Sequence, residues 1–179
     1  MTCAALVRVA LTGTPGTGKT SVGSELSRRG HRVVDLAALA EEKGFVHHPA
    51  KGHGPGIVDV ETLRKASLPG EGLVFLSSHF SHLVDVDIVV VLRCSPKVLT
   101  SRLRSRGWDD SKIRDNVEAE AIDLITIEAM ERCGRVYEVD TTSIDAEEAA
   151  RQIIEIVNGA VEGHEAGRID WSEEILTWY

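Results

Sequence analysis

The sequence has no long hydrophobic run and no cluster of basic residues, and each absence excludes a class of protein. The apolar start from Ala4 to Leu11 is interrupted by Arg8, and no stretch approaches the roughly 18 apolar residues of a membrane span. The net charge is -8 without any basic run. A protein that binds nucleic acid needs clustered Lys and Arg, so neither sequence-specific nucleic-acid binding nor a membrane partner is expected.

Closely spaced cysteines are also missing. Cys3, Cys94 and Cys133 are far apart and form no CxxC pair, which argues against a disulfide framework and against a zinc site. We therefore expect reduced cysteines in a soluble, cytoplasmic protein. A chain of 179 residues with 42% hydrophobic content is long enough for one well-buried domain and too short for two ordinary ones.

Short apolar runs alternate with segments of helical periodicity, which predicts an α/β fold with a central parallel five-stranded sheet. The expected strands are Leu6 to Leu11, Arg32 to Val34, Leu73 to Leu76, Ile88 to Leu92 and Val136 to Val139. Ser95 and Asp145 have the pattern of helix caps. The longest helix is expected over 111–133, with these apolar residues on one face: Ile113, Val117, Leu124 and Ile127.

One motif carries the chemistry. The pattern G-x-x-x-x-G-K-[ST] occurs as Gly13, Gly18, Lys19 and Thr20, between a predicted strand and a predicted helix. This context favours a phosphate-binding loop over an unrelated glycine-rich turn. Lys19 is expected to reach the β- and γ-phosphates of ATP, and the Thr20 hydroxyl to bind Mg²⁺. The predicted nucleotide-binding residues are Gly13, Thr14, Pro15, Gly16, Thr17, Gly18, Lys19, Thr20 and Ser21.

A missing motif and a pair of arginines favour a kinase over a regulatory GTPase. A regulatory GTPase needs a guanine-reading NKxD segment, and the sequence has none. Arg102 and Arg106 are four residues apart on the helix that begins at Ser95, and they lead into Gly107. Such a pair suits a lid that closes over ATP and neutralises the transferring phosphoryl group. The alternative is a solvated basic helix face.

Four segments carry a family resemblance, namely LTGTPGTGKTSV, VVDLAALAEEKG, IVDVETL and VVVLRCSPKVLTSRLRSRGWDDSKIRDNVEAEA. In these segments the sequence resembles the adenylate kinase isoenzyme six family, also called CINAP-like proteins, in its archaeal type. The resemblance implies a three-layer, Rossmann-like P-loop NTPase fold with a short lid and an arm that binds the nucleoside monophosphate. It also implies a role in small-ribosomal-subunit maturation, with a basic ribosomal protein as partner.

The resemblance also implies a division of the chain. Residues 1–158 would form the kinase-like domain, with the arm at about 36–69 and the lid at about 107–112. Residues 159–179 would be a glycine-containing linker and an acidic, aromatic tail that either packs on the core or docks onto a partner. The composition of residues 45–56, with three glycines and two prolines, agrees with a loop or mobile arm.

Site residues follow by position. Arg102 and Arg106 would be the lid arginines near adenine and phosphate, and Thr141 would belong to the adenine pocket. The residues Asp140 to Thr142 are also typical of a turn, which is the alternative for this segment. Asp35, at the end of the second strand, would lie near Mg²⁺ or AMP, and a plain helix cap is the alternative.

Two departures from the family pattern stand out. Family members end the third strand in D-x-H, whereas this chain has Ser77, Ser78 and His79, so Mg²⁺ would depend on Thr20, the phosphates and Asp35. His79 is expected to contact phosphate or acceptor, with a structural role as the alternative. The arm is basic rather than acidic. A solvated loop explains its residues better than a metal site does: His47, His48, Lys51 and His53.

These features predict a kinase that uses ATP with Mg²⁺ to phosphorylate AMP, with Lys19, Arg102, Arg106 and His79 in the catalytic site. Two alternatives stay open. The first is an assembly factor whose ATP state switches binding of a basic ribosomal protein, with incidental kinase or ATPase activity. The second is a P-loop kinase for another small metabolite.

Overall fold

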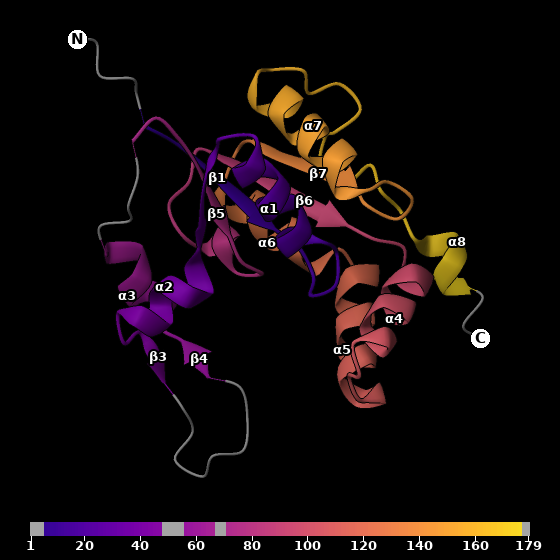
Figure 1. The fold of residues 1–179 in the computed structure, drawn as a ribbon. Coiled ribbons are helices and arrows are strands. Elements are labelled where there is room, and N and C mark those ends of the chain that lie inside the picture. The colour runs from indigo at the N-terminus through magenta and orange to yellow at the C-terminus, as the bar shows by residue number, and fades with distance from the viewer. Residues whose placement is uncertain (1–5, 48–55, 67–70, 177–179) are drawn as a thin grey trace.

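The central sheet is parallel and has five strands in the order β2-β5-β1-β6-β7 (Figure 1). A computed structural model describes residues 6–47, 56–66 and 71–176. The strands are β1 (Val7–Thr12), β2 (Arg32–Asp35), β5 (Leu73–Ser77), β6 (Ile88–Arg93) and β7 (Val136–Asp140). All five predicted strands are confirmed to within one residue at each end, and so is the α/β class.

Helices cover both faces of this sheet, which gives the expected three layers (Figure 1). The helices are α1 (Lys19–Arg28), α2 (Leu36–Glu42), α3 (Val60–Lys65), η1 (Ser81–Leu83), α4 (Pro96–Ser105), α5 (Asp110–Ala121), α6 (Leu124–Arg132), α7 (Ala146–Val157) and α8 (Ser172–Ile175). Helices α1 and α7 contact each other on one face, and α6 lies on the other. Within the described residues, no helix is long and apolar enough to cross a bilayer.

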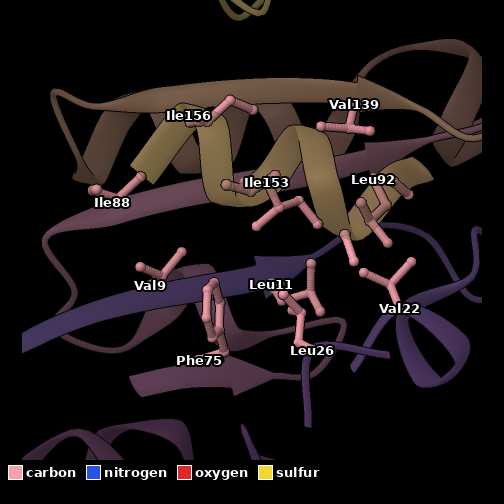
Figure 2. Packing of buried hydrophobic residues seen from close by; sticks show 13 residues of the cluster. Val9, Leu11, Val22, Leu26, Phe75, Ile88, Leu92, Val139, Ile153 and Ile156 are labelled. Atoms are coloured by element: carbon pink, nitrogen blue, oxygen red, sulfur yellow. The ribbon is translucent and has the colours of Figure 1, made fainter. Parts of the chain in front are cut away.

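The core follows from the alternation of side chains along the strands. Val9 and Leu11 of β1 point to the face covered by α1 and α7, where they pack with Ile153 and Ile156 (Figure 2). Ala10, between them, packs on the opposite face against α6. Both faces are buried, which is why these strands read as continuous apolar runs.

The arm region combines short helices with a small hairpin. Strands β3 (Val46–His47) and β4 (Ile57–Val58) pair antiparallel, so this stretch is not purely a loop. Helices α2 and α3 bury Leu36 and Leu63 beside Leu76 of the sheet. His48, Lys51 and His53 lie outside the described residues. The limits of the arm and of the lid stay predictions.

The expectation of one helix over 111–133 is wrong. The chain breaks at Asp123, which has a left-handed backbone (φ 58), and so α5 and α6 are separate helices. Ile113 and Val117 are buried against α4, but Leu124 and Ile127 are 40% and 51% exposed. An ion pair between Asp123 and a buried arginine of β6 accompanies the break. Local periodicity gives no signal for such a tertiary contact.

The C-terminal segment packs on the core as far as it is described. The amide of Glu138 in β7 donates to the carbonyl of His164 at 2.7 Å, and α8 contacts α4. Residues 177–179 lie outside the described residues. The caps at Ser95 and Asp145 are confirmed, because their side chains accept hydrogen bonds from the first turns of α4 and α7.

Candidate functional site

The phosphate loop connects β1 to α1, and glycine is required at both of its ends. Gly13 has φ 134, and a Cβ atom there would lie 2.3 Å from the carbonyl oxygen of Leu92. Gly18 has φ 106 and occupies the N-cap position of α1. The loop therefore turns tightly into the helix, whose first N–H groups have no partner within the helix. This arrangement favours a bound anion.

Lys19 extends back over the loop that precedes it. Its Nζ atom donates to the carbonyl oxygens of Gly13 at 2.6 Å and of Thr14 at 3.0 Å. Burial lowers the pKa of Lys19 to about 8; the carboxylate of Glu120 opposes this shift and the guanidinium of Arg106 adds to it. At neutral pH most of the lysine is protonated, and its charge is available to a phosphate.

A cavity of about 200 Å³ adjoins this ammonium group. It brings together the predicted catalytic residues Lys19, His79 and Arg106 with the predicted Mg²⁺ ligand Thr20. Loss of water around the ring lowers the pKa of His79, and the positive charge of Lys19 lowers it further, although the side chain keeps an exposed surface. His79 is therefore mainly neutral at pH 7 and can donate or accept a hydrogen bond there.

A second cavity, of about 310 Å³, shares four lining residues with the first: Gly16, Gly18, Ser21 and Arg106. Here the guanidinium of Arg102 donates to the carbonyl oxygen of Thr141 at 2.6 Å and to its hydroxyl at 3.3 Å. The two predicted arginines thus lie on one cavity wall. A larger groove of about 850 Å³ between α4, α5 and α8 contains no residue of the phosphate loop, so its size does not make it the nucleotide site.

Asp35 lines neither cavity. Its carboxylate accepts hydrogen bonds from the amides of Ala37 at 2.9 Å and Ala38 at 3.1 Å, which is the helix cap considered as its alternative role. Among the described residues, no three His, Cys, Asp or Glu side chains gather into a group that could hold a metal. The donors that fit Mg²⁺ here are the Thr20 hydroxyl and the phosphates of a nucleotide.

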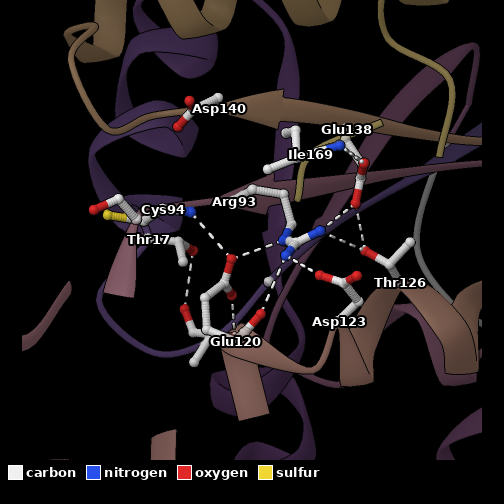
Figure 3. A network of polar contacts seen from close by, with 12 residues as sticks. Thr17, Arg93, Cys94, Glu120, Asp123, Thr126, Glu138, Asp140 and Ile169 are labelled. Carbon is white, nitrogen blue, oxygen red and sulfur yellow. Dashed lines mark hydrogen bonds and ion pairs between the residues drawn. The ribbon is translucent and has the colours of Figure 1, made fainter. Parts of the chain in front are cut away.

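A buried polar network lies behind the loop, and no sequence pattern predicts it (Figure 3). Arg93, at the end of β6, is 1% exposed and forms ion pairs with Glu120, Glu138 and Asp123. Glu120 lies in the last turn of α5 and also accepts a hydrogen bond from Thr14 of the phosphate loop. Charged residues on a helix and at a strand end usually indicate solvent-facing positions, so burial could not be anticipated.

A known family matches this loop and the sheet around it. The family model described as an AAA domain covers residues 9–123. The protein belongs to this AAA domain family. A protein of Archaeoglobus fulgidus named "Putative adenylate kinase" is 46% identical over 134 residues, which cover 75% of this chain and 72% of the relative. One of the same name from Pyrococcus abyssi is 41% identical over 170 residues, 92% of this chain and 91% of the relative.

The AAA domain protein is thus a P-loop nucleotide kinase of the adenylate kinase-like family. Its fold also matches a solved structure of shikimate kinase from Acinetobacter baumannii, with a TM-score of 0.55 over 87% of this chain and 94% of that one. The sequence identity to that kinase is 19%. At this identity the likeness shows the P-loop kinase fold and does not bear on the acceptor.

Proposed function

We propose that this protein is an adenylate kinase that transfers the γ-phosphoryl group of ATP to AMP. The observation that carries the proposal is the convergence of Lys19, His79 and Arg106 on one cavity at the N-terminus of α1. Phosphoryl transfer depends mainly on positioning and on neutralising charge, and two cations with a neutral hydrogen-bonding ring supply both. The archaeal relatives named for this activity support the assignment.

ATP would lie across the two cavities. Its β- and γ-phosphates would occupy the one beside Lys19, and its nucleoside the one between Arg102 and Thr141. Arg106 borders both cavities, where its guanidinium can neutralise the charge on the transferring group. Mg²⁺ would enter with ATP and be held by phosphate oxygens and the Thr20 hydroxyl, lowering the charge of the phosphates.

AMP would bind on the side of the arm, about residues 36–69. His79 follows β5, the strand next to β2, and β2 leads directly into the arm. A neutral His79 can donate a hydrogen bond from its one ring N–H group to the phosphate of the acceptor. This assigns His79 a binding role at the acceptor.

A second candidate is an ATP-dependent assembly factor in small-ribosomal-subunit maturation. Three observations favour it. Ser77 stands where the resembled family has a carboxylate. The missing carboxylate should lower the rate of phosphoryl transfer more than it weakens nucleotide binding. The C-cap of α5 and helix α6 also expose an apolar set that a protein partner could cover, namely Ile122 of the cap and Leu124, Ile127 and Met130 of α6. The acidic net charge of -8 suits a basic ribosomal protein.

The deciding experiment measures ADP formation from ATP and Mg²⁺, with and without AMP, for the wild type and for Lys19→Ala. AMP-dependent ADP formation that Lys19→Ala abolishes would establish the adenylate kinase. Slow ATP hydrolysis that ignores AMP would reject it and favour the assembly factor. Other small acceptors that accelerate ADP formation, with AMP inactive, would indicate a metabolite kinase.

A further inference from the structure

A carboxylate of helix α5 accepts a hydrogen bond from the phosphate loop, on the side away from the cavity. The hydroxyl of Thr14 donates to Oε2 of Glu120 at 2.6 Å, and both side chains are only 2% exposed. Thr14 is the second residue of the loop, and Glu120 lies more than one hundred residues later in the chain. A buried hydrogen bond to an ionised carboxylate is short and strong, and it fixes the position of its donor.

Glu120 is itself held in place. Its other oxygen, Oε1, accepts from Nε of Arg93 at 2.7 Å and from the amide of Cys94 at 3.1 Å (Figure 3). Arg93 also donates to the backbone carbonyl of Glu120 at 3.1 Å. The carboxylate therefore has both oxygens satisfied and is anchored to the end of β6, beside the strand that carries the loop.

The backbone carbonyl of Thr14 is a hydrogen-bond acceptor for Lys19. Nζ of Lys19 donates to the Thr14 carbonyl oxygen at 3.0 Å, and the hydroxyl of Thr17 donates to the same oxygen at 2.9 Å. A shift of Thr14 would thus move one of the two carbonyl oxygens that hold the ammonium group above the loop, the other being that of Gly13. Misplacement by about 1 Å can cost a large part of the rate of a positioned reaction.

We propose that Glu120 is a positioning residue for phosphoryl transfer, which holds the phosphate loop through the Thr14 hydroxyl and thereby sets the place of Lys19. The proposal rests on the proposed function only for its readout, which is turnover of ATP. Glu120 touches no substrate in this arrangement and acts through Thr14.

The charge of Glu120 supports the same role. The carboxylate raises the pKa of Lys19 against the effect of burial, so it helps to keep the ammonium group protonated. Helix α5 (Asp110–Ala121) carries Glu120 in its last turn and begins inside the predicted lid, at about residues 107–112. One helix therefore extends from the lid to the back of the phosphate loop.

The alternative is that the buried network only stabilises the fold. Thr126 provides a matched control that separates this structural role from a positioning role. Thr126 is also 2% exposed, and its hydroxyl donates to Glu138 of the same network at 2.8 Å. Thr126 lies on α6 and lines neither nucleotide cavity. Thr14→Val and Thr126→Val each remove one buried hydroxyl from one carboxylate of the Arg93 cluster.

The experiment compares Thr14→Val, Thr14→Ser and Thr126→Val in thermal stability and in kcat and KM for ATP, with AMP present. We expect Thr14→Val to lower kcat about tenfold or more while KM changes less than about threefold. Thr14→Ser keeps the hydroxyl and should restore most of kcat. Thr126→Val should lose about as much thermal stability as Thr14→Val but keep the kcat of the wild type. Equal kcat for the two valine variants, or no rescue by serine, would overturn the proposal.

Glu120→Gln adds a readout that a purely structural role would not move. Removing the negative charge should shift the alkaline limb of the pH profile of kcat/KM to lower pH, because the pKa of Lys19 loses its support; an unmoved limb would count against the proposal. The wild type is assayed first, so that a failure of AMP dependence is seen separately. If AMP dependence fails, the same variants are compared in the rate of ATP hydrolysis. A lower rate in Thr14→Val alone would support the proposal, and equal rates in the two valine variants would overturn it.

Discussion

The hydroxyl of Thr141 donates a hydrogen bond to the carbonyl oxygen of Thr17, 2.7 Å away, and so joins the segment after β7 to the phosphate loop. The Thr141 carbonyl in turn accepts from Arg102. Arg102 is therefore tethered in the cavity of about 310 Å³, the proposed nucleoside cavity. Arg106, one helical turn further on, forms no ion pair within the described part of the chain and borders the cavity of about 200 Å³, the proposed phosphate cavity. The two arginines should have separable roles.

Replacing each arginine by alanine tests this separation. We expect Arg106→Ala to lower kcat about 10³-fold with little change in KM for ATP, because its charge is needed mostly in the transition state. Arg102→Ala should mainly raise KM for ATP, roughly tenfold, because the wall of the nucleoside cavity loses its anchor. Steady-state kinetics at saturating AMP would measure both parameters.

Arg104 provides the control on the same helix. It lines the separate groove between α4 and α5, where it lies 3.7 Å from Asp110, and both side chains are largely exposed. Exposed ion pairs contribute little, so Arg104→Ala should stay within about twofold of the wild type. If Arg106→Ala behaved like Arg104→Ala, the assigned role of Arg106 would be wrong.

The pH dependence should report Lys19. Its pKa of about 8 in the free protein means that the ammonium form dominates below pH 8 and is lost above it. We expect kcat/KM for ATP to fall as pH rises through 8. The limb in kcat should lie at higher pH, because bound phosphates favour the charged lysine. Profiles from pH 6.5 to 10 would show both limbs.

Lys19→Arg is the control for that assignment, because arginine stays protonated throughout this range. The variant should have lower activity but no alkaline limb in kcat/KM. A wild-type profile that stays flat above pH 9 would contradict the assignment, and so would a limb that persists in the arginine variant.

The sheet and the phosphate loop could be predicted because their signals are local. Buried parallel strands are continuous apolar runs. Backbone geometry requires the glycine at position 13 of the loop, because a Cβ atom there would lie 2.3 Å from the Leu92 carbonyl oxygen. The division of 111–133 at Asp123 could not be predicted, because an ion pair with Arg93 accompanies it and these residues are thirty positions apart.

The same reasoning explains what was missed at the site. Motif spacing and strand ends predict Lys19, Arg106 and His79 as site residues, and the structure brings them together. Glu120 lies in a segment that resembles the family, yet its burial follows only from the packing of α5 against β6 and the phosphate loop. The sequence therefore predicts residues that line the cavity and does not predict the buried residue behind the phosphate loop.

Ser77 offers a gain-of-function test. It ends β5 with a half-buried side chain, where the resembled family has a carboxylate. Carboxylates are preferred Mg²⁺ ligands, so Ser77→Asp should lower the Mg²⁺ concentration for half-maximal ADP formation several-fold. Ser77→Asn has similar size without the charge and should not do so. Identical Mg²⁺ curves for the wild type, Ser77→Asp and Ser77→Asn would show that this position does not reach the metal.

Asp35 tests the opposite case, a residue predicted to bind metal that the structure places in a helix cap. Asp35→Ala removes two hydrogen bonds from the first turn of α2, and should lower the free energy of unfolding by about 1 kcal/mol. Asp35→Ser can still cap the helix and should recover most of this loss. Denaturant unfolding would give the stabilities, and Mg²⁺ titration of ADP formation would give the metal requirement. Because the carboxylate lines neither cavity, both variants should keep the Mg²⁺ requirement of the wild type. A raised requirement in Asp35→Ser, with stability preserved, would instead place Asp35 at the metal.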